Sequence, residues 1–136
     1  MGHRNVQGLD YLSENEFILS TDHGPAGGDE INLATIPDSI QNFGWPISSY
    51  GIHYGTENAL NDSHSADLDR IIASAPLHKS HSDYGFTEPI KYYNLNPGIS
   101  EARFLNINNN NLSFLVSSLG YDTIQRPEAK SINVFN

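Results

Sequence analysis

Residues that can do chemistry are concentrated in the first 32 positions of the chain. Three short motifs follow one another there: residues 2–9 (Gly-His-Arg-Asn-Val-Gln-Gly-Leu), 22–25 (Asp-His-Gly-Pro) and 28–32 (Gly-Asp-Glu-Ile-Asn). They combine a guanidinium, several amides and a group of carboxylates around turn-forming glycines. Arginine and aspartate are seldom buried without a partner, so this density of polar side chains indicates a functional site rather than core.

Each motif residue also has a purely structural interpretation. A single arginine such as Arg4 is most often a surface or ion-paired residue, and amides such as Asn5 and Gln7 commonly cap turns. A Gly-Pro pair such as Gly24-Pro25 usually does no more than turn the chain. Residue type and spacing leave both interpretations open.

The segments that must position these motifs are short strands. Residues 8–12 and 17–21 flank a polar loop at 13–16, which predicts a β-hairpin. Turn signals recur between short apolar runs and no helical period is sustained, so the chain is expected to be all-β. The remaining expected elements are strands or extended segments at 30–34, 45–50, 87–93, 112–119 and 131–135, an Asn-rich turn at 106–111, and a polar insertion loop at about 55–70 with one short helix at 67–73.

Composition limits the kind of protein this can be. The chain has 136 residues, 38% of them hydrophobic, with 7 basic and 16 acidic side chains and a formal net charge of −9. This size predicts a single domain, residues 1–136, with a modest core. The acidic balance argues against nucleic-acid and anionic-membrane partners, because like charges repel. The sequence has no apolar run of membrane-spanning length, no recognisable signal peptide and no cysteine, which excludes disulfides and thiolate chemistry.

The three motifs resemble those of the pyrroloquinoline-quinone (PQQ) dependent soluble sugar dehydrogenases, also called the glucose/sorbosone dehydrogenase family. Further matches to that family are residues 42–46 (Asn-Phe-Gly-Trp-Pro), 49–51 (Ser-Tyr-Gly), 88–93 and 97–100. The resemblance is strong from residue 2 to about residue 100 and weak beyond it.

The resemblance implies a fold and raises the question of completeness. Members of the family fold as six-bladed β-propellers, and a blade takes roughly 40 to 50 residues, so this chain would supply about three blades. Propeller blades contact one another around a closed ring, whereas half a ring leaves open sheet edges. We therefore expect either a fragment of a longer protein, which we favour, or a chain that pairs with the missing propeller half or with another copy of itself.

The same resemblance implies what the motif residues bind. Arg4 and Asn5 would contact PQQ, and Gln7 would face PQQ or the sugar substrate. A planar guanidinium suits carboxylate and carbonyl oxygens and stabilises negative charge on a reduced quinone. The backbone carbonyls of Gly24 and Pro25 would bind a calcium ion that also holds PQQ, because calcium prefers oxygen ligands.

Neighbouring residues have supporting roles in this interpretation. Asp22 is expected to pair with Arg4, Asp29 to hold the turn through backbone N–H groups, and Glu30 to open the next strand. Trp45 is expected to pack within a blade. Of the two adjacent tyrosines at 92 and 93, one is expected to face inward and one outward.

The histidines are not expected to supply the catalytic base. His3 is not the catalytic histidine of the family, which would lie upstream of the motif. The other five show no metal-ligand spacing and are expected to be mostly solvated loop residues: His23, His53, His64, His78 and His81. Three features depart from the family pattern. Val6 replaces a proline, no lysine lies near Gly120, and the arginines that complete the PQQ site would fall past Asn136.

Two functional classes remain open from the sequence. The first is a fragment of a PQQ- and calcium-dependent aldose dehydrogenase, which in its intact form is periplasmic or extracellular. The second is a non-catalytic propeller segment with a structural, ligand-binding or calcium-binding role. A lactonase-like hydrolytic propeller is disfavoured by the order of the motifs. Without the upstream base and the downstream cations, the isolated chain is expected to be inactive.

Overall fold

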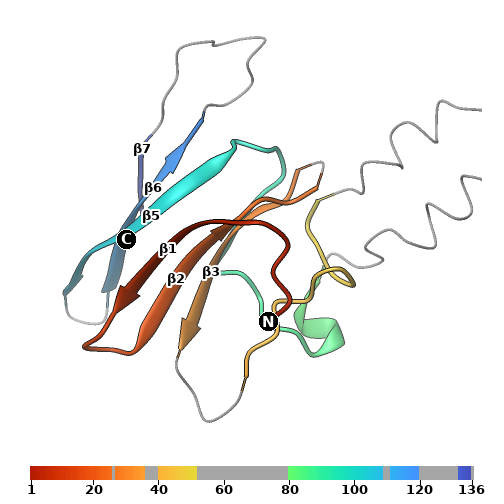
Figure 1. Cartoon of the computed structure of the whole chain (residues 1–136), viewed down its shortest axis with the longest axis horizontal. Coiled ribbons are helices and arrows are strands. Elements are labelled where there is room, and N and C mark those ends of the chain that lie inside the picture. The colour runs from red at the N-terminus through yellow and green to blue at the C-terminus, as the bar shows by residue number, and fades with distance from the viewer. Residues whose placement is uncertain (26, 36–39, 52–79, 109–110, 120–131, 136) are drawn as a thin grey trace, which may run out of the picture.

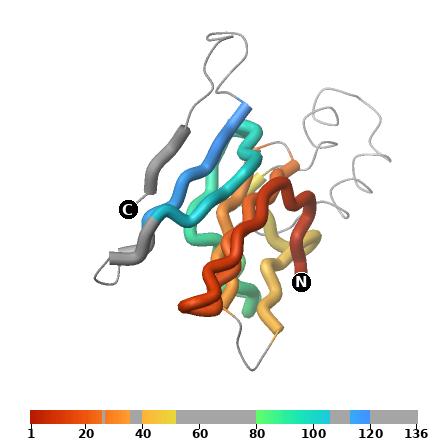
Figure 2. Tube along the Cα trace, turned by 60° about the vertical axis from the view of Figure 1, so that its left-hand side comes forward, coloured from red at the N-terminus to blue at the C-terminus, as the bar shows by residue number. Residues whose placement is uncertain are grey.

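The computed structural model describes residues 1–25, 27–35, 40–51, 80–108, 111–119 and 132–135. These residues form two antiparallel β-sheets that lie against each other (Figures 1 and 2). No helix within these ranges is long and apolar enough to cross a membrane. The prediction of an all-β protein is confirmed.

The first sheet has four strands in the order β1-β2-β3-β4. They are β1 (Val6–Leu12), β2 (Phe17–Asp22), β3 (Asp29–Thr35) and β4 (Lys91–Tyr93). β1 and β2 pair in antiparallel register, with Leu12 opposite Phe17, so the predicted hairpin is confirmed. The two tyrosines of β4 face opposite sides of the sheet, as expected: Tyr93 packs against the core, and Tyr92 is 41% exposed.

The second sheet has three strands in the order β5-β6-β7. They are β5 (Ile99–Asn108), β6 (Asn111–Ser118) and β7 (Ile132–Phe135). β6 and β7 match the predicted strands at 112–119 and 131–135. β5 was not predicted, because Ser100, Glu101 and Arg103 interrupt its apolar pattern, and its end includes part of the expected turn at 106–111.

The hydrophobic core lies between the two sheets. Its fully or almost fully buried side chains are Leu19, Ile31, Ile99, Ala102, Phe114 and Val116. The first two come from β2 and β3, and the other four come from β5 and β6. Burial of a large apolar side chain is worth roughly 1.5–3 kcal/mol, so this shared core holds the two sheets together.

Gly8, in the first motif, allows β1 to approach β5 closely. A Cβ atom on Gly8 would lie 2.4 Å from the carbonyl oxygen of Ser100 and 2.8 Å from the backbone nitrogen of Ala102. Both atoms belong to the backbone of β5, so they cannot give way as a flexible side chain would. The motif glycine therefore has a packing role between the sheets.

Gly8→Ala is expected to lower the free energy of unfolding by about 3 kcal/mol, because the added methyl group must push two backbones apart. Chemical denaturation measures this change. Gly85→Ala is the matched control, since nothing lies within 4 Å of its added Cβ. Its cost is expected to be about 1 kcal/mol, from the left-handed backbone alone. Equal losses for the two variants would contradict the packing role of Gly8.

Two segments outside the sheets are bound to the start of the chain and to β3. Residues 40–51 are tied to residues 1 and 2 through Phe43 N–H and Trp45 N–H, which donate to the carbonyls of Met1 and Gly2. Residues 80–90 contain the short 3-10 helix η1 (Ser82–Tyr84) and end where the N–H of Ile90 donates to the carbonyl of Ile31. The first of these segments builds one wall of the pocket described below, through Phe43, Trp45, Ser48 and Ser49.

Other predictions differ from the structure. Residues 45–50 are not extended, because the N–H groups of Ile47 and Ser48 both donate to the carbonyl of Gly44 and close a turn. Only Lys91–Tyr93 of the predicted strand at 87–93 is a strand. The described residues contain two sheets, of four and three strands, which agrees with the expected part of a propeller, and they do not test the expected number of about three blades. The insertion loop at 55–70 and the helix at 67–73 lie outside the described residues.

Candidate functional site

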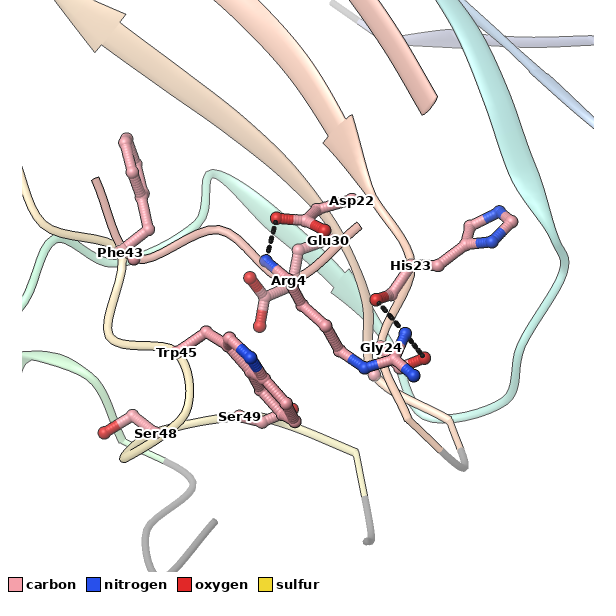
Figure 3. A pocket seen from close by; sticks show the side chains of 11 residues that line it. Arg4, Asp22, His23, Gly24, Glu30, Phe43, Trp45, Ser48 and Ser49 are labelled. Carbon is pink, nitrogen blue, oxygen red and sulfur yellow. Dashed lines mark hydrogen bonds between the residues drawn. The ribbon is translucent and has the colours of Figure 1, made fainter. Parts of the chain in front are cut away.

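A small polar pocket lies where β2 ends and β3 begins (Figure 3). The start of the chain closes it on one side, and the turn after Gly44 closes it on the other. Its polar and aromatic lining includes Arg4, Asp22, Glu30, Trp45, Ser48 and Ser49. The free space in the pocket measures about 10 Å³, which is roughly the space needed for one water molecule.

Arg4 is the central side chain of this pocket. Its Nη1 atom donates to the backbone carbonyls of His23, at 2.9 Å, and Gly24, at 3.0 Å. The guanidinium carbon lies 5.4 Å from the centre of the Trp45 ring, within the range of a cation–π interaction. Figure 3 shows the Arg4 side chain between the Trp45 ring and the turn that follows β2. The first two motifs therefore meet through Arg4.

Asp22 fixes the backbone that carries Arg4. Its carboxylate, in a residue that is only 3% exposed, accepts the backbone N–H groups of Arg4, at 3.1 Å, and Asn5, at 2.5 Å. His3 Nδ1 lies 3.1 Å from the same carboxylate. Asp22 thus contacts Arg4 through the main-chain N–H of Arg4, and this contact ties the start of the chain to the end of β2.

Asp29 holds the turn as predicted. One carboxylate oxygen accepts the N–H of Gly24 at 3.1 Å, and the other accepts the N–H groups of Gly98 and Ile99 at 3.0 and 3.2 Å. The residue is 1% exposed. Because Ile99 begins β5, Asp29 links the turn to the second sheet. β3 begins at Asp29, and Glu30 is its second residue.

Asn5 and Gln7 lie at the same end of the first sheet as Arg4. The Asn5 carbonyl accepts the N–H of His23, and the Gln7 amide donates to Asn5 Oδ1 at 3.0 Å. Val6 pairs with Asp22 and Gly8 with Thr21, so Gln7 occupies a β-bulge. Bulges often re-aim side chains next to functional sites. Both amides are exposed to solvent and open to a ligand.

The two carbonyls expected to bind calcium already accept hydrogen bonds. Arg4 Nη1 donates to Gly24 O, and Asn96 Nδ2 donates to Pro25 O at 2.8 Å. Calcium needs about 6 to 8 oxygen ligands, and the nearby carboxylates of Asp22 and Asp29 are bound to backbone N–H groups. A guanidinium 3.0 Å from Gly24 O would also repel a divalent cation on that oxygen. Calcium could therefore bind these two carbonyls only after Arg4 and Asn96 release them.

Several pocket residues were missed or misassigned from the sequence. Glu30 lines the pocket, and His81 lies behind it with Nε2 3.4 Å from Glu30 Oε1. His81 is 1% exposed, so the expectation of a solvated loop histidine is wrong. His81 is buried by contacts with residues distant in sequence, such as Glu30, which lies 51 positions earlier. No local sequence pattern indicates such a contact. Trp45 lies in a turn outside both sheets, half-buried, and does not pack within a blade.

The remaining histidines divide into two groups. His23 is half-buried with its Nε2 atom against the carbonyl of Ile99, and it is also not a solvated residue. His53, His64 and His78 lie outside the described residues. Among the described residues, no group of three or more histidine, aspartate or glutamate side chains is arranged to hold a metal ion.

A second set of hydrogen bonds centres on Glu88, beside the pocket wall. Its Oε1 accepts the N–H groups of His81 and Ser82 at 2.9 and 2.7 Å, and its Oε2 accepts the Tyr50 hydroxyl at 2.7 Å. Burial opposes ionisation, but the N–H of Ser82 and the Tyr50 hydroxyl outweigh it and lower the pKa of Glu88 to about 2. Burial and the Glu88 carboxylate raise the pKa of Tyr50.

The lowered pKa of Glu88 gives the protein an acid-sensitive contact. A carboxyl group whose pKa is lowered on folding stabilises the folded state at pH values above its unfolded pKa of 4.5. This stabilisation is lost as the pH falls toward about 2. We expect Glu88→Gln to flatten the dependence of unfolding free energy on pH in that window. Denaturation at several acidic pH values measures this slope. Glu14→Gln removes the same charge from an exposed loop and is the control; an equal effect there would contradict the prediction.

The fold and the pocket define a class of protein: an all-β partial β-propeller with an arginine–carbonyl pocket at one end of a blade. The sequence profile of the Glucose / Sorbosone dehydrogenase family matches residues 1–134. The chain therefore belongs to the glucose/sorbosone dehydrogenase family.

The chain is also similar to individual proteins. The chain is 30% identical to the aldose sugar dehydrogenase YliI of Escherichia coli over 105 residues, which are 77% of this chain and 23% of that protein. It is 43% identical over 59 residues to an uncharacterized protein of Synechocystis, covering 43% of this chain and 14% of that one.

Solved structures show the same partial match. The soluble aldose sugar dehydrogenase of Escherichia coli in its apo form superposes with a TM-score of 0.58 and 27% identity, over 87% of this chain and 29% of the solved chain. A glucose dehydrogenase gives a TM-score of 0.58 and 30% identity, over 87% of this chain and 30% of the solved one. The chain thus spans less than a third of the length of these propellers.

Proposed function

We propose that this chain supplies part of the cofactor site of a PQQ- and calcium-dependent aldose dehydrogenase. The chemistry that PQQ would supply when bound is acceptance of the hydride that leaves the sugar carbon as its hydroxyl group is oxidised. The observation that carries the proposal is the contact between Arg4 and the carbonyls of His23 and Gly24. This contact joins residues 2–9, which resemble a PQQ-binding motif, to residues 22–25, which resemble a calcium-binding turn. The longer protein would work in the periplasm or outside the cell.

Arg4 would bind the acidic cofactor and stabilise negative charge on its oxygens, because a guanidinium forms short, charge-assisted hydrogen bonds. Asp22 would orient Arg4 through the two backbone N–H groups that it accepts. The Trp45 ring, 5.4 Å from the guanidinium, would keep water from that side of it. Asn5 and Gln7 would offer amide donors and acceptors to the cofactor or the sugar.

The size of the pocket sets where the cofactor would lie. A cavity of about 10 Å³ does not admit a three-ring quinone. PQQ would therefore bind outside this cavity, beside the exposed Asn5 and Gln7, and would reach Arg4 from there. Calcium binding by the Gly24 and Pro25 carbonyls would require Arg4 and Asn96 to release them.

The catalytic base and the cations on the opposite side of the cofactor would come from the rest of the longer protein. Proximity and orientation contribute roughly 7 to 11 kcal/mol to lowering a barrier, and a partial site forfeits most of this. We expect the 136-residue chain, supplied with calcium and PQQ, to show no dye-linked aldose oxidation, whereas the full-length protein oxidises aldoses. Turnover by the isolated chain that Arg4→Ala abolishes would contradict this division of the catalytic groups.

A non-catalytic propeller segment is the alternative. It is favoured by the hydrogen bonds that already satisfy the Gly24 and Pro25 carbonyls, which resemble a finished structural turn. The same assay separates the two functions. A full-length protein that is folded, loaded with PQQ and calcium, and inactive on aldoses would support the structural role.

A further inference from the structure

His81 is buried without an ordinary set of partners. It is 1% exposed, and neither ring nitrogen makes a well-formed hydrogen bond with the described residues. Its Nε2 atom nevertheless lies 3.4 Å from Glu30 Oε1, within the range of an ion pair, and Glu30 is only 8% exposed. Buried polar groups are normally hydrogen-bonded, so this pair calls for a specific explanation.

His81 connects to the pocket through the turn that carries Trp45. A Cβ atom on Gly44 would lie 3.2 Å from His81 Nδ1, so the imidazole packs directly against the backbone of Gly44. That residue opens the turn through its carbonyl, which accepts the N–H of Ser48 at 3.0 Å. Trp45 follows it and faces the Arg4 guanidinium at 5.4 Å. Glu30, the partner of His81, lines the same pocket from β3.

The groups around His81 favour its charged form. Glu30 faces it from β3, and Glu88 accepts the His81 N–H from the segment after η1. From residues 40–51, the Tyr50 ring stacks on it at 5.2 Å, and Tyr92 of β4 stacks on Tyr50 at 3.6 Å. Burial opposes protonation, but Glu30 and then Glu88 outweigh it and raise the pKa of His81.

We propose that His81 and Glu30 are positioning residues for Arg4: their ion pair clamps the turn at residues 44–48 to β3 and so holds the Trp45 ring over the Arg4 guanidinium. A histidine with a raised pKa contributes this attraction fully below its unfolded value of 6.5 and loses it as the pH rises through the folded value. The packing of Trp45 against Arg4 should therefore loosen as the pH rises above the pKa of His81 in the folded protein.

Trp45 is the only tryptophan in the chain and reports this change directly. We would label the full-length protein with fluorotryptophan and follow the ¹⁹F resonance of Trp45, assigned by its loss in Trp45→Phe, between about pH 5.5 and about pH 9. The expected result is one transition with a midpoint above 6.5. His81→Gln should remove the transition, and Glu30→Gln should lower its midpoint, because the attracting charge is lost.

Glu101→Gln is the matched control, since it removes the same charge from a surface ion pair with Arg103, 3.2 Å away, and does not face His81. It should leave the midpoint unchanged. Circular dichroism establishes that each variant is folded; if His81→Gln is not, the midpoint in Glu30→Gln decides. A wild-type protein without a transition, a transition that persists in folded His81→Gln, or an unchanged midpoint in Glu30→Gln would overturn the proposal. Because the readout is geometric, failure of this clamp would leave the proposed function standing.

Discussion

Asp29→Ala is expected to lower the free energy of unfolding by about 4 kcal/mol, because hydrogen bonds to a charged acceptor are worth roughly 1.5–3 kcal/mol each and are not fully additive. Three backbone N–H groups, those of Gly24, Gly98 and Ile99, would lose their acceptor. The site is 1% exposed, so water cannot readily replace the carboxylate. Chemical denaturation measures the loss.

Two further variants test whether the loss of stability comes from the Asp29 carboxylate itself. Asp29→Asn keeps one acceptor oxygen in place of two and is expected to lie between the wild type and Asp29→Ala. Asp83→Ala removes an aspartate from the exposed η1 and is expected to change stability by less than about 0.5 kcal/mol. A loss below about 1 kcal/mol for Asp29→Ala would mean that the turn and β5 do not depend on this carboxylate.

Arg4→Ala in the full-length protein is expected to reduce kcat/KM for aldose oxidation by about 10² to 10³-fold, the effect seen when one charge-stabilising donor is removed. The reason is that the Arg4 guanidinium contacts the turn expected to bind calcium, with Nη1 2.9 and 3.0 Å from the carbonyls of His23 and Gly24. Arg4→Lys retains the charge but loses the planar fork, so we expect partial activity.

Arg103→Ala is the control for this effect. Arg103 lies on β5 and is 61% exposed, and it pairs with Asp10 and Glu101 on the surface. Its replacement is expected to leave kcat/KM within about twofold, because exposed ion pairs contribute little. If Arg4→Ala and Arg103→Ala had equal effects, Arg4 would have no special part in the reaction.

Local patterns in the sequence were sufficient to predict the hairpin of β1 and β2. The polar loop between Leu12 and Phe17 sets the register of β1 and β2, so the hairpin follows from neighbours in sequence. The meeting of Arg4 with the Gly24 carbonyl follows from the same pairing, because Val6 lies opposite Asp22. Asp29 was also correctly predicted as the residue that holds the turn.

The parts that could not be predicted depend on contacts between distant segments. β5 has a polar sequence at residues 100 and 101, and it forms a strand because Ile99 and Ala102 are buried by the first sheet. Gly8 resembles a turn glycine, yet its role is set by the backbone of β5. His81 looks like a loop histidine, and only the fold brings it behind Gly44 and beside Glu30.

The most direct test of the central claim is a crystal structure of the full-length protein with PQQ and calcium. We predict that the Arg4 guanidinium lies within about 3.2 Å of a PQQ oxygen. We also predict that the cofactor lies beside Asn5 and Gln7 and outside the small cavity. PQQ bound elsewhere, with Arg4 still donating to the His23 and Gly24 carbonyls as it does here, would contradict the proposed cofactor site.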